Sequence, residues 1–195
     1  SRFSDPGGFP APAVRGCFMS HLRVHQDILS NGVNTALILE DDADFSRHFA
    51  QRIGAMAATL QHRDWHMLYG WSPERSSGGD TAGDTAFQPF DPHTGIRTSH
   101  FIGVRGSVSR RLVPYFEAML TRPLGDPDGG PMHVDGAYSW FRAAHPDMVT
   151  LVPGMPLAVQ RPSRSDIHAS RWFYKVEGLE PVIRTLRRIK RAVRA

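Results

Sequence analysis

The sequence has a single cysteine among its 195 residues and no long apolar segment. One cysteine, Cys17, excludes an internal disulfide framework and any zinc site built from several cysteines, which favours a reducing compartment. No stretch approaches the roughly 20 uninterrupted apolar residues that a membrane-spanning helix requires, and the N-terminus lacks the basic start and apolar run of a signal peptide. We therefore expect a cytoplasmic chain, with Cys17 as a packed helix residue.

Excess basic charge is confined to the C-terminal tail. The formal net charge is +4, but six basic residues follow Pro181, and without them the charge is −2. A mildly acidic body argues against nucleic acid as a partner. In the tail, apolar residues recur every three or four positions, which predicts a basic amphipathic helix over 181–195. Such a helix either packs on the domain or contacts an anionic membrane, and we favour a peripheral location on the inner face of the cytoplasmic membrane.

Helix and strand patterns alternate along residues 1–180, which we assign to one domain. A helical pattern runs from Val14 to a stop at Asn31-Gly32, and the apolar run 35–39 predicts a strand covered on both faces. Further helices are expected around 49–60, 112–120 and 138–144, further strands at 66–69, 101–104, 148–152 and 157–159, and a flap or disordered loop at 71–97. The alternation predicts an α/β fold with a mainly parallel sheet, helices on both faces and ligand binding at the carboxyl ends of the strands.

Four carboxylates occupy five positions directly after the strand 35–39: Glu40, Asp41, Asp42 and Asp44. Their mutual repulsion would be relieved by a hard divalent cation such as Mg²⁺ or Mn²⁺, which would also neutralise a diphosphate leaving group. Spacing alone equally allows a solvated acidic turn that lies at the positive end of the next helix. A metal-dependent phosphohydrolase is a weaker alternative, because the sequence shows no second cluster of metal ligands.

The segment Gly16–Leu22 resembles the G-C-x-x-S-H-L helix of glycosyltransferase family 25, whose members include lipopolysaccharide and collagen galactosyltransferases. The L-E-D-D at 39–42 follows at the family's spacing. Later segments also resemble the family, so that the likeness spans residues 14–168: Trp65–Gly70, Gly103–Arg111, Pro156–Gln160 and Ser165–Ile167. Nothing before Val14 resembles the family's opening strand, so we expect the first nucleotide-binding strand to be missing, through truncation or loss.

The resemblance implies a GT-A-like fold, a UDP-sugar donor such as UDP-galactose, a manganese-like ion and inversion at the anomeric carbon. The expected acceptor is a glycan or a lipid-linked saccharide in bacterial lipopolysaccharide or other surface-polysaccharide synthesis. A glycosyltransferase-like domain that binds a glycan or scaffolds a partner without turnover is the alternative.

The resemblance also assigns roles to individual residues. The expected metal ligands are Glu40, Asp42 and Asp44, with Asp42 as the first choice. The expected donor contacts are Ser20, His21, Glu40, Asp41, Gln160, Ser165 and Asp166. Asp135 matches the family's P-x-x-x-D region and is the expected catalytic base, although an aspartate at a helix start also suits an N-cap. Further candidates for a metal or phosphate contact are His100, His133 and His168.

Overall fold

The computed structural model describes residues 5–47, 49–74 and 87–161. The helices among them are α1 (Pro12–Ser30), α2 (Phe49–Gln61), α3 (Gly106–Thr121) and α4 (Val134–Ala144). The strands are β1 (Thr35–Leu39), β2 (Ala43–Phe45), β3 (Met67–Tyr69), β4 (Phe87–Phe90), β5 (Phe101–Arg105), β6 (Thr150–Pro153) and β7 (Ala158–Gln160). The predicted contacts Ser165, Asp166 and His168, the domain boundary at 180 and the predicted tail helix lie outside the described residues.

The main sheet is mixed, with the strand order β1-β5-β3-β6-β4. Only β3 and β6 pair in parallel, whereas the other three neighbouring pairs are antiparallel. The predicted α/β class is confirmed, but the prediction of a mainly parallel sheet is wrong. The alternation of helix and strand patterns did not predict the strand directions, because two helices, α3 and α4, follow each other between β5 and β6. The second helix brings the chain back to the end of the sheet where β5 finished, so β6 runs opposite to β5. A single crossover helix, as between β1 and β3, leaves two strands running the same way.

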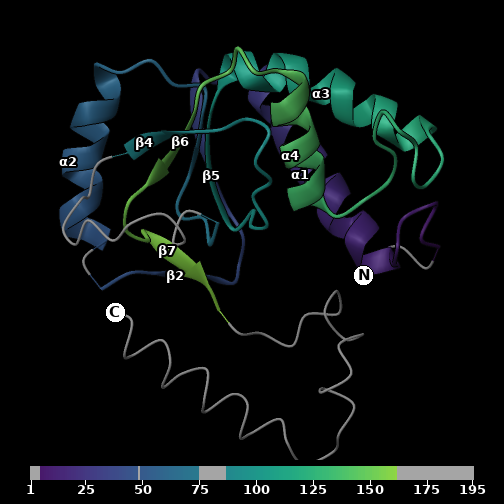
Figure 1. Ribbon diagram of the computed structural model, residues 1–195, viewed down its shortest axis with the longest axis horizontal. Helices are drawn as coiled ribbons and strands as arrows, with labels where there is room; N and C mark the ends of the chain where they lie inside the picture. The colour runs from purple at the N-terminus through teal and green to yellow at the C-terminus, as the bar shows by residue number, and fades with distance from the viewer. Residues whose placement is uncertain (1–4, 48, 75–86, 162–195) are drawn as a thin grey trace, which may run out of the picture.

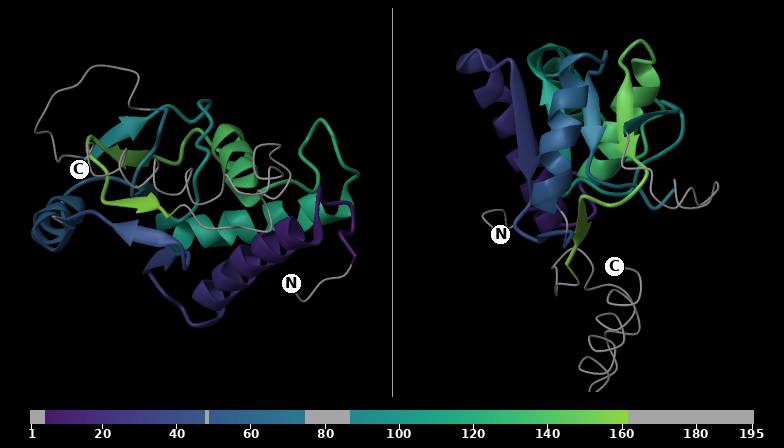
Figure 2. Two further views of the ribbon diagram at one scale, coloured as in Figure 1. Left: turned by 90° about the horizontal axis from the view of Figure 1, so that it is seen from below. Right: turned by 90° about the vertical axis from the view of Figure 1, so that its left-hand side faces the viewer.

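Helices cover both faces of the sheet, as predicted (Figure 1). One face packs Met67, Tyr69 and Val104 into the main core, which α1, α3 and α4 complete. The opposite face packs Leu68 and Phe101 into a second core with α2 and the segment that leads into β7. Figure 2 shows α1 and α3 lying side by side along the first face, in agreement with their extensive contact. Side chains that alternate along each strand therefore pack into two separate cores, one on each face of the sheet.

Strand β1 forms an edge of the described sheet. Ile38 is buried against the main core. Its neighbours in the sequence, Leu37 and Leu39, point to the opposite face of the strand and are 48% and 43% exposed. The predicted bounds of this strand are confirmed, whereas the prediction that both of its faces are covered is wrong. An apolar run fits an edge strand with one open face as well as a fully buried strand, because the sequence does not specify its neighbours.

Part of the predicted loop at 71–97 is a strand. Residues 87–90 form β4, which pairs antiparallel with β6 at the other edge of the sheet. Pro89 interrupts the pattern of an ordinary strand, and it is tolerated here because an edge strand needs partners on one side only. Across the described residues, no helix is long and apolar enough to span a bilayer.

Candidate active site

The acidic turn lies at the edge of the sheet where three strands end. β1, β3 and β6 run in the same direction, so their carboxyl ends share this edge. Glu40 follows β1 and donates its backbone N–H to the carbonyl of His100 at 3.0 Å, while Gly70 follows β3 and donates to the carbonyl of Phe101 at 3.0 Å. The predicted placement of the carboxylates at a strand end is thus confirmed, although β5, which lies between β1 and β3, runs the opposite way.

A second, two-stranded sheet holds the other side of the turn. β2 pairs antiparallel with β7, and the backbone N–H of Arg161 donates to the carbonyl of Asp42 at 2.7 Å. Gln160, at the end of β7, donates its side-chain amide to Oδ2 of Asp42 at 2.8 Å. Two residues far apart in the sequence, both predicted as site residues, are therefore in direct contact.

Glu40 points into the protein rather than towards the neighbouring carboxylates. Its Oε1 accepts a hydrogen bond from the Ser99 hydroxyl at 2.6 Å and lies 3.3 Å from Nε2 of His21. Burial raises the pKa of Glu40, but the hydrogen bonds from His21 and Ser99 outweigh burial, so the pKa is lower than usual. Glu40 is therefore ionised at neutral pH and anchored to α1.

The remaining carboxylates of the turn have different surroundings. Oδ1 of Asp42 is buried and has no hydrogen-bond partner among the described residues, which is unusual for a carboxylate oxygen. Asp41 is exposed, and Asp44 lies within β2 with its Oδ1 3.9 Å from Nε of Arg161. The turn thus presents Asp42 at its base, while Glu40 belongs to the interior.

A chain of buried polar side chains continues inward from Glu40. The hydroxyl of Tyr138, on α4, lies 3.0 Å from Nδ1 of His21 and 2.7 Å from Nε2 of His25. Nδ1 of His25 then lies 2.8 Å from the Ser109 hydroxyl on α3. Burial lowers the pKa of His25 to about 3, with nearby His21 adding to the effect. His25 is accordingly neutral at physiological pH.

All hydrogen bonds of this polar chain can form without any ion, with the donors pointing in one consistent direction. With Glu40 ionised, Nε2–H of His21 donates to Glu40 and the Tyr138 hydroxyl donates to Nδ1 of His21. Nε2–H of His25 donates to the Tyr138 oxygen, and the Ser109 hydroxyl donates to Nδ1 of His25. Each ring nitrogen of His21 and His25 then has a partner, which makes the arrangement stable inside the core.

Asp135 approaches the same region from the start of α4. Burial raises the pKa of the Cys17 thiol to about 12, and the charges of Glu40, Asp135 and Asp42 add to this effect, so all three acids are near enough to act on the thiol. The N-cap residue of α4 is His133, and Asp135 lies one position inside the helix, where its Oδ1 accepts from the N–H of Gly136 at 2.8 Å. Asp135 therefore lies in the first turn of α4. The alternative that Asp135 is the N-cap residue is wrong, because His133 holds that position.

Of the other predicted residues, Ser20 and His133 are exposed, whereas His100 lies next to Glu40. Ser20 is exposed on α1, and its hydroxyl donates back to the carbonyl of Gly16. His133 is also exposed, whereas His100 is buried, with Nε2 3.3 Å from the carbonyl of Ala158 and no partner for Nδ1 in the described residues. Sequence reasoning missed the site neighbours Cys17, His25, Ser99 and Tyr138.

The structure is an α/β domain with a group of carboxylates at the edge where β1, β3 and β6, which run the same way, end. Comparison with known proteins gives a partial match to one family. Residues 14–81, which contain most of α1 and all of β1, β2, α2 and β3, match the model of glycosyltransferase family 25 (LPS biosynthesis protein). The predicted resemblance is confirmed over this segment, which includes Cys17, His21 and the whole acidic turn.

One curated relative also matches part of the chain. Procollagen galactosyltransferase 1 from Danio rerio is 32% identical over 71 residues, which are 34% of this chain and 12% of that protein. The match thus covers about an eighth of the length of the relative. Over its first part, the chain is therefore similar both to a glycosyltransferase family and to a galactosyltransferase.

Proposed function

We propose that this chain transfers a sugar, galactose in the first instance, from a UDP-sugar to a glycan or lipid-linked saccharide in bacterial lipopolysaccharide or other surface-polysaccharide synthesis. The reaction is inverting and assisted by a divalent ion such as Mn²⁺ or Mg²⁺. The family match over residues 14–81 and the galactosyltransferase relative support the class of reaction. A GT-A-like arrangement is supported by β1 and β3, which run the same way with α2 between them in the chain.

The observation that carries the proposal is the buried Oδ1 of Asp42, which has no hydrogen-bond partner among the described residues. Leaving a carboxylate oxygen desolvated and unpaired costs several kilocalories per mole unless a cation or a ligand proton reaches it. The donor set at this turn consists of carboxylate oxygens, which suits Mg²⁺ or Mn²⁺. Asp42 therefore fits the role of metal ligand better than Glu40, whose side chain points inward.

When bound, the ion supplies positive charge to the diphosphate of the donor and of the leaving group. Oδ2 of Asp42 is fixed by Gln160, which orients Oδ1. Asp44 and Asp41, on the open side of the turn, are further donor or metal contacts. Asp135, at the start of α4, is the base that takes the proton of the acceptor hydroxyl. Its charge acts on the Cys17 thiol, as do the charges of Glu40 and Asp42, which supports a place near the acidic turn.

The place of action is the cytoplasm, at the inner face of the membrane, where a lipid-linked acceptor is found. The basic segment 181–195 supports this part of the proposal by its sequence alone, since it lies outside the described residues. Co-sedimentation with vesicles that contain anionic lipid should be lost when residues 181–195 are deleted. Equal sedimentation of the full and shortened chains would contradict membrane binding through residues 181–195.

Isothermal titration calorimetry with UDP tests the function directly. The full chain should give binding heat with UDP and MnCl₂, and little heat when a chelator replaces the metal. Asp42→Asn should abolish the metal-dependent heat without changing the fold, because it removes charge but no core volume. Asp64→Asn, a matched change at an exposed aspartate far along the chain, should bind like the wild type.

Two results would contradict the proposal. If the wild-type chain gives no metal-dependent heat with UDP, the non-catalytic alternative of a glycan-binding or scaffolding domain is favoured. If Asp42→Asn binds UDP and Mn²⁺ as the wild type does, Asp42 is not the metal ligand. Release of UDP from UDP-galactose in the presence of an oligosaccharide acceptor then separates binding from turnover.

A further inference from the structure

Three different metal-binding side chains converge inside the domain, next to the acidic turn. Cys17 and His21 are four residues apart on α1, so they lie on the same face of the helix, and Glu40 approaches them from the end of β1. One ligand atom from each, a sulfur, a ring nitrogen and a carboxylate oxygen, lies within 4.8 Å of the other two. Nε2 of His21 and Oε1 of Glu40 are 3.3 Å apart.

The orientation of the His21 ring is fixed by the rest of the protein. Its Nδ1 faces the hydroxyl of Tyr138 at 3.0 Å, which leaves Nε2 directed at Glu40. Metal-binding histidines generally carry such an outer hydrogen bond on the second ring nitrogen, which fixes the ring and raises its basicity. Tyr138 is itself held by His25, so the outer contact extends into the core through a second helix.

The donor set is unlike that of the acidic turn. One sulfur, one nitrogen and one oxygen suit Zn²⁺, which binds these atoms at about 2.0–2.3 Å with tetrahedral geometry, whereas Mg²⁺ and Mn²⁺ prefer oxygen. The side chains are buried or half-buried, with the side chain of His21 5% exposed and that of Glu40 21% exposed. Three protein ligands leave one tetrahedral position for water.

We propose that Cys17, His21 and Glu40 bind one zinc-type divalent ion, separate from the diphosphate-linked ion at Asp42. On binding, a sulfur–metal bond forms as the thiol proton leaves to solvent. The ring of His21 exchanges its Nε2 proton for one on Nδ1, so it stays neutral, the Nε2 lone pair binds the metal, and the thiol proton is the net release. The ion ties α1 to the end of β1 and holds the acidic turn from the inside.

Metal binding exchanges donor and acceptor in each hydrogen bond of the polar chain from His21 to Ser109. With the metal on Nε2, Nδ1–H of His21 donates to the Tyr138 oxygen, and the Tyr138 hydroxyl donates to Nε2 of His25. Nδ1–H of His25 then donates to the Ser109 oxygen, at an unchanged separation of the heavy atoms. His25 thus changes from the Nε2–H to the Nδ1–H tautomer without touching the ion.

Cobalt(II) titration of the full chain, after removal of metal with a chelator, tests the site without any nucleotide. One equivalent of Co²⁺ should produce a sulfur-to-cobalt charge-transfer band and visible bands typical of tetrahedral coordination, and Zn²⁺ should displace both. Cys17→Ser should lose the charge-transfer band, and Glu40→Gln should weaken Co²⁺ binding at least tenfold. Ser20→Ala, on the exposed side of the same helix, should leave the spectrum unchanged.

Asp42→Asn separates this site from the ion of the proposed function. The variant should keep the charge-transfer band while losing Mn²⁺-dependent UDP binding, so failure of one proposal does not decide the other. If the wild-type chain shows no charge-transfer band, the group is a hydrogen-bonded cluster only and the proposal is wrong. Loss of the band in Asp42→Asn would likewise overturn the claim of a separate site.

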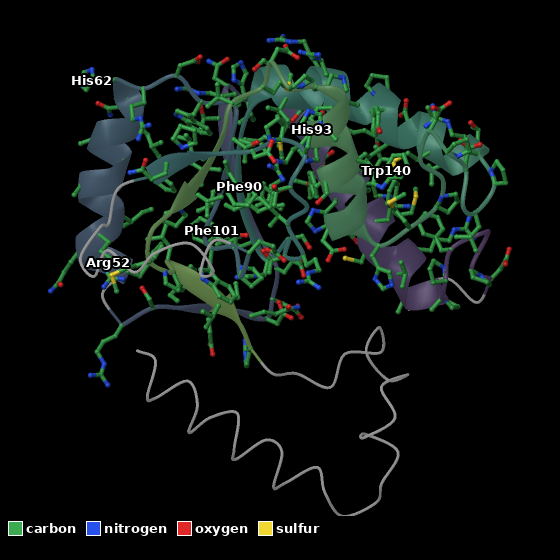
Figure 3. All side chains as sticks on the ribbon, viewed as in Figure 1. Arg52, His62, Phe90, His93, Phe101 and Trp140 are labelled. Carbon is green, nitrogen blue, oxygen red and sulfur yellow. The ribbon has the colours of Figure 1, made fainter. Side chains whose placement is uncertain are left out.

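Nitrogen NMR of the histidine rings gives a readout that needs no substitution. Zn²⁺ should move the proton of His25 from Nε2 to Nδ1, while the ring of His62, which is exposed just after α2, stays unchanged (Figure 3). A His25 tautomer that does not respond to Zn²⁺ contradicts binding through Nε2 of His21.

Discussion

Lowering the pH from 7 to 5 should destabilise the fold through His25. The side chain of His25 is fully buried between α1, α3 and α4, and its pKa is lowered to about 3 by burial and by His21. In the unfolded chain the same histidine titrates at about 6.5. Between these values the unfolded state binds a proton that the folded state does not, so the free energy of unfolding falls as the pH falls. Above pH 6.5 the effect is absent.

The size of the effect follows from the difference between the two pKa values. Each pH unit below about 6.5 costs about 1.4 kcal/mol, so the step from pH 7 to pH 5 costs about 2 kcal/mol. The groups that face His25 do not reverse this trend. Tyr138 stays protonated because burial raises its pKa well above the usual value, and Ser109 does not titrate. Glu40, whose pKa is lower than usual, remains ionised throughout this window.

Urea denaturation followed by circular dichroism at pH 7, 6 and 5, with a chelator present, measures the effect. His25→Gln should be less stable at pH 7 but should show a loss between pH 7 and 5 that is smaller by about 2 kcal/mol. His62→Gln, at an exposed histidine, is the matched control and should keep the slope of the wild type. The reasoning is refuted if His25→Gln and the wild type lose the same free energy over this interval.

Three further predictions concern other parts of the molecule. Asp42→Asn should abolish sugar transfer and leave the melting temperature within the error of the wild type, as measured by thermal denaturation. Asp135→Asn should lower turnover but retain UDP binding, and a lower melting temperature with full specific activity of the folded fraction would assign Asp135 to helix stability instead. Arg142→Met should lower the free energy of unfolding by about 3 kcal/mol in urea denaturation, because the buried guanidinium donates to the carbonyls of Asp91 and Thr94 and to the Thr150 hydroxyl, and these hydrogen bonds are lost. Arg110→Met, at an exposed arginine, is its control and should change stability by less than about 0.5 kcal/mol.

The parts of the fold that depend on local pattern could be predicted from the sequence. The bounds of β1 agree with the apolar run 35–39, and α1 ends before Gly32, which has a positive φ of 63°. The direction of the strands depends on which strands become neighbours, and β5 pairs with β1 across more than 60 residues of sequence. No local pattern specifies such a pairing, so the sheet direction was predicted wrongly.

The candidate site shows the same division. The carboxylates of the turn follow β1 directly, so their position at a strand end could be predicted. The inward direction of Glu40 could not, because it depends on Ser99 and His21, which come from different elements. The burial of His25 could have been predicted from the sequence, because Phe18, His21 and His25 fall on the apolar stripe of α1, which packs on the core. Its partner Tyr138 is 113 residues away and could be found only in the folded chain.

The face of α1 that carries this stripe has two functions at once. Phe18 and Leu22 pack into the main core, while His21 on the same buried stripe and the half-buried Cys17 reach the end of β1. A rotation of α1 that moved the apolar residues out of the core would also move Nε2 of His21 away from Glu40. The geometry of the acidic turn is therefore tied to core packing, and substitutions at Phe18 should disturb metal binding at Cys17 even though Phe18 has no polar atom to offer.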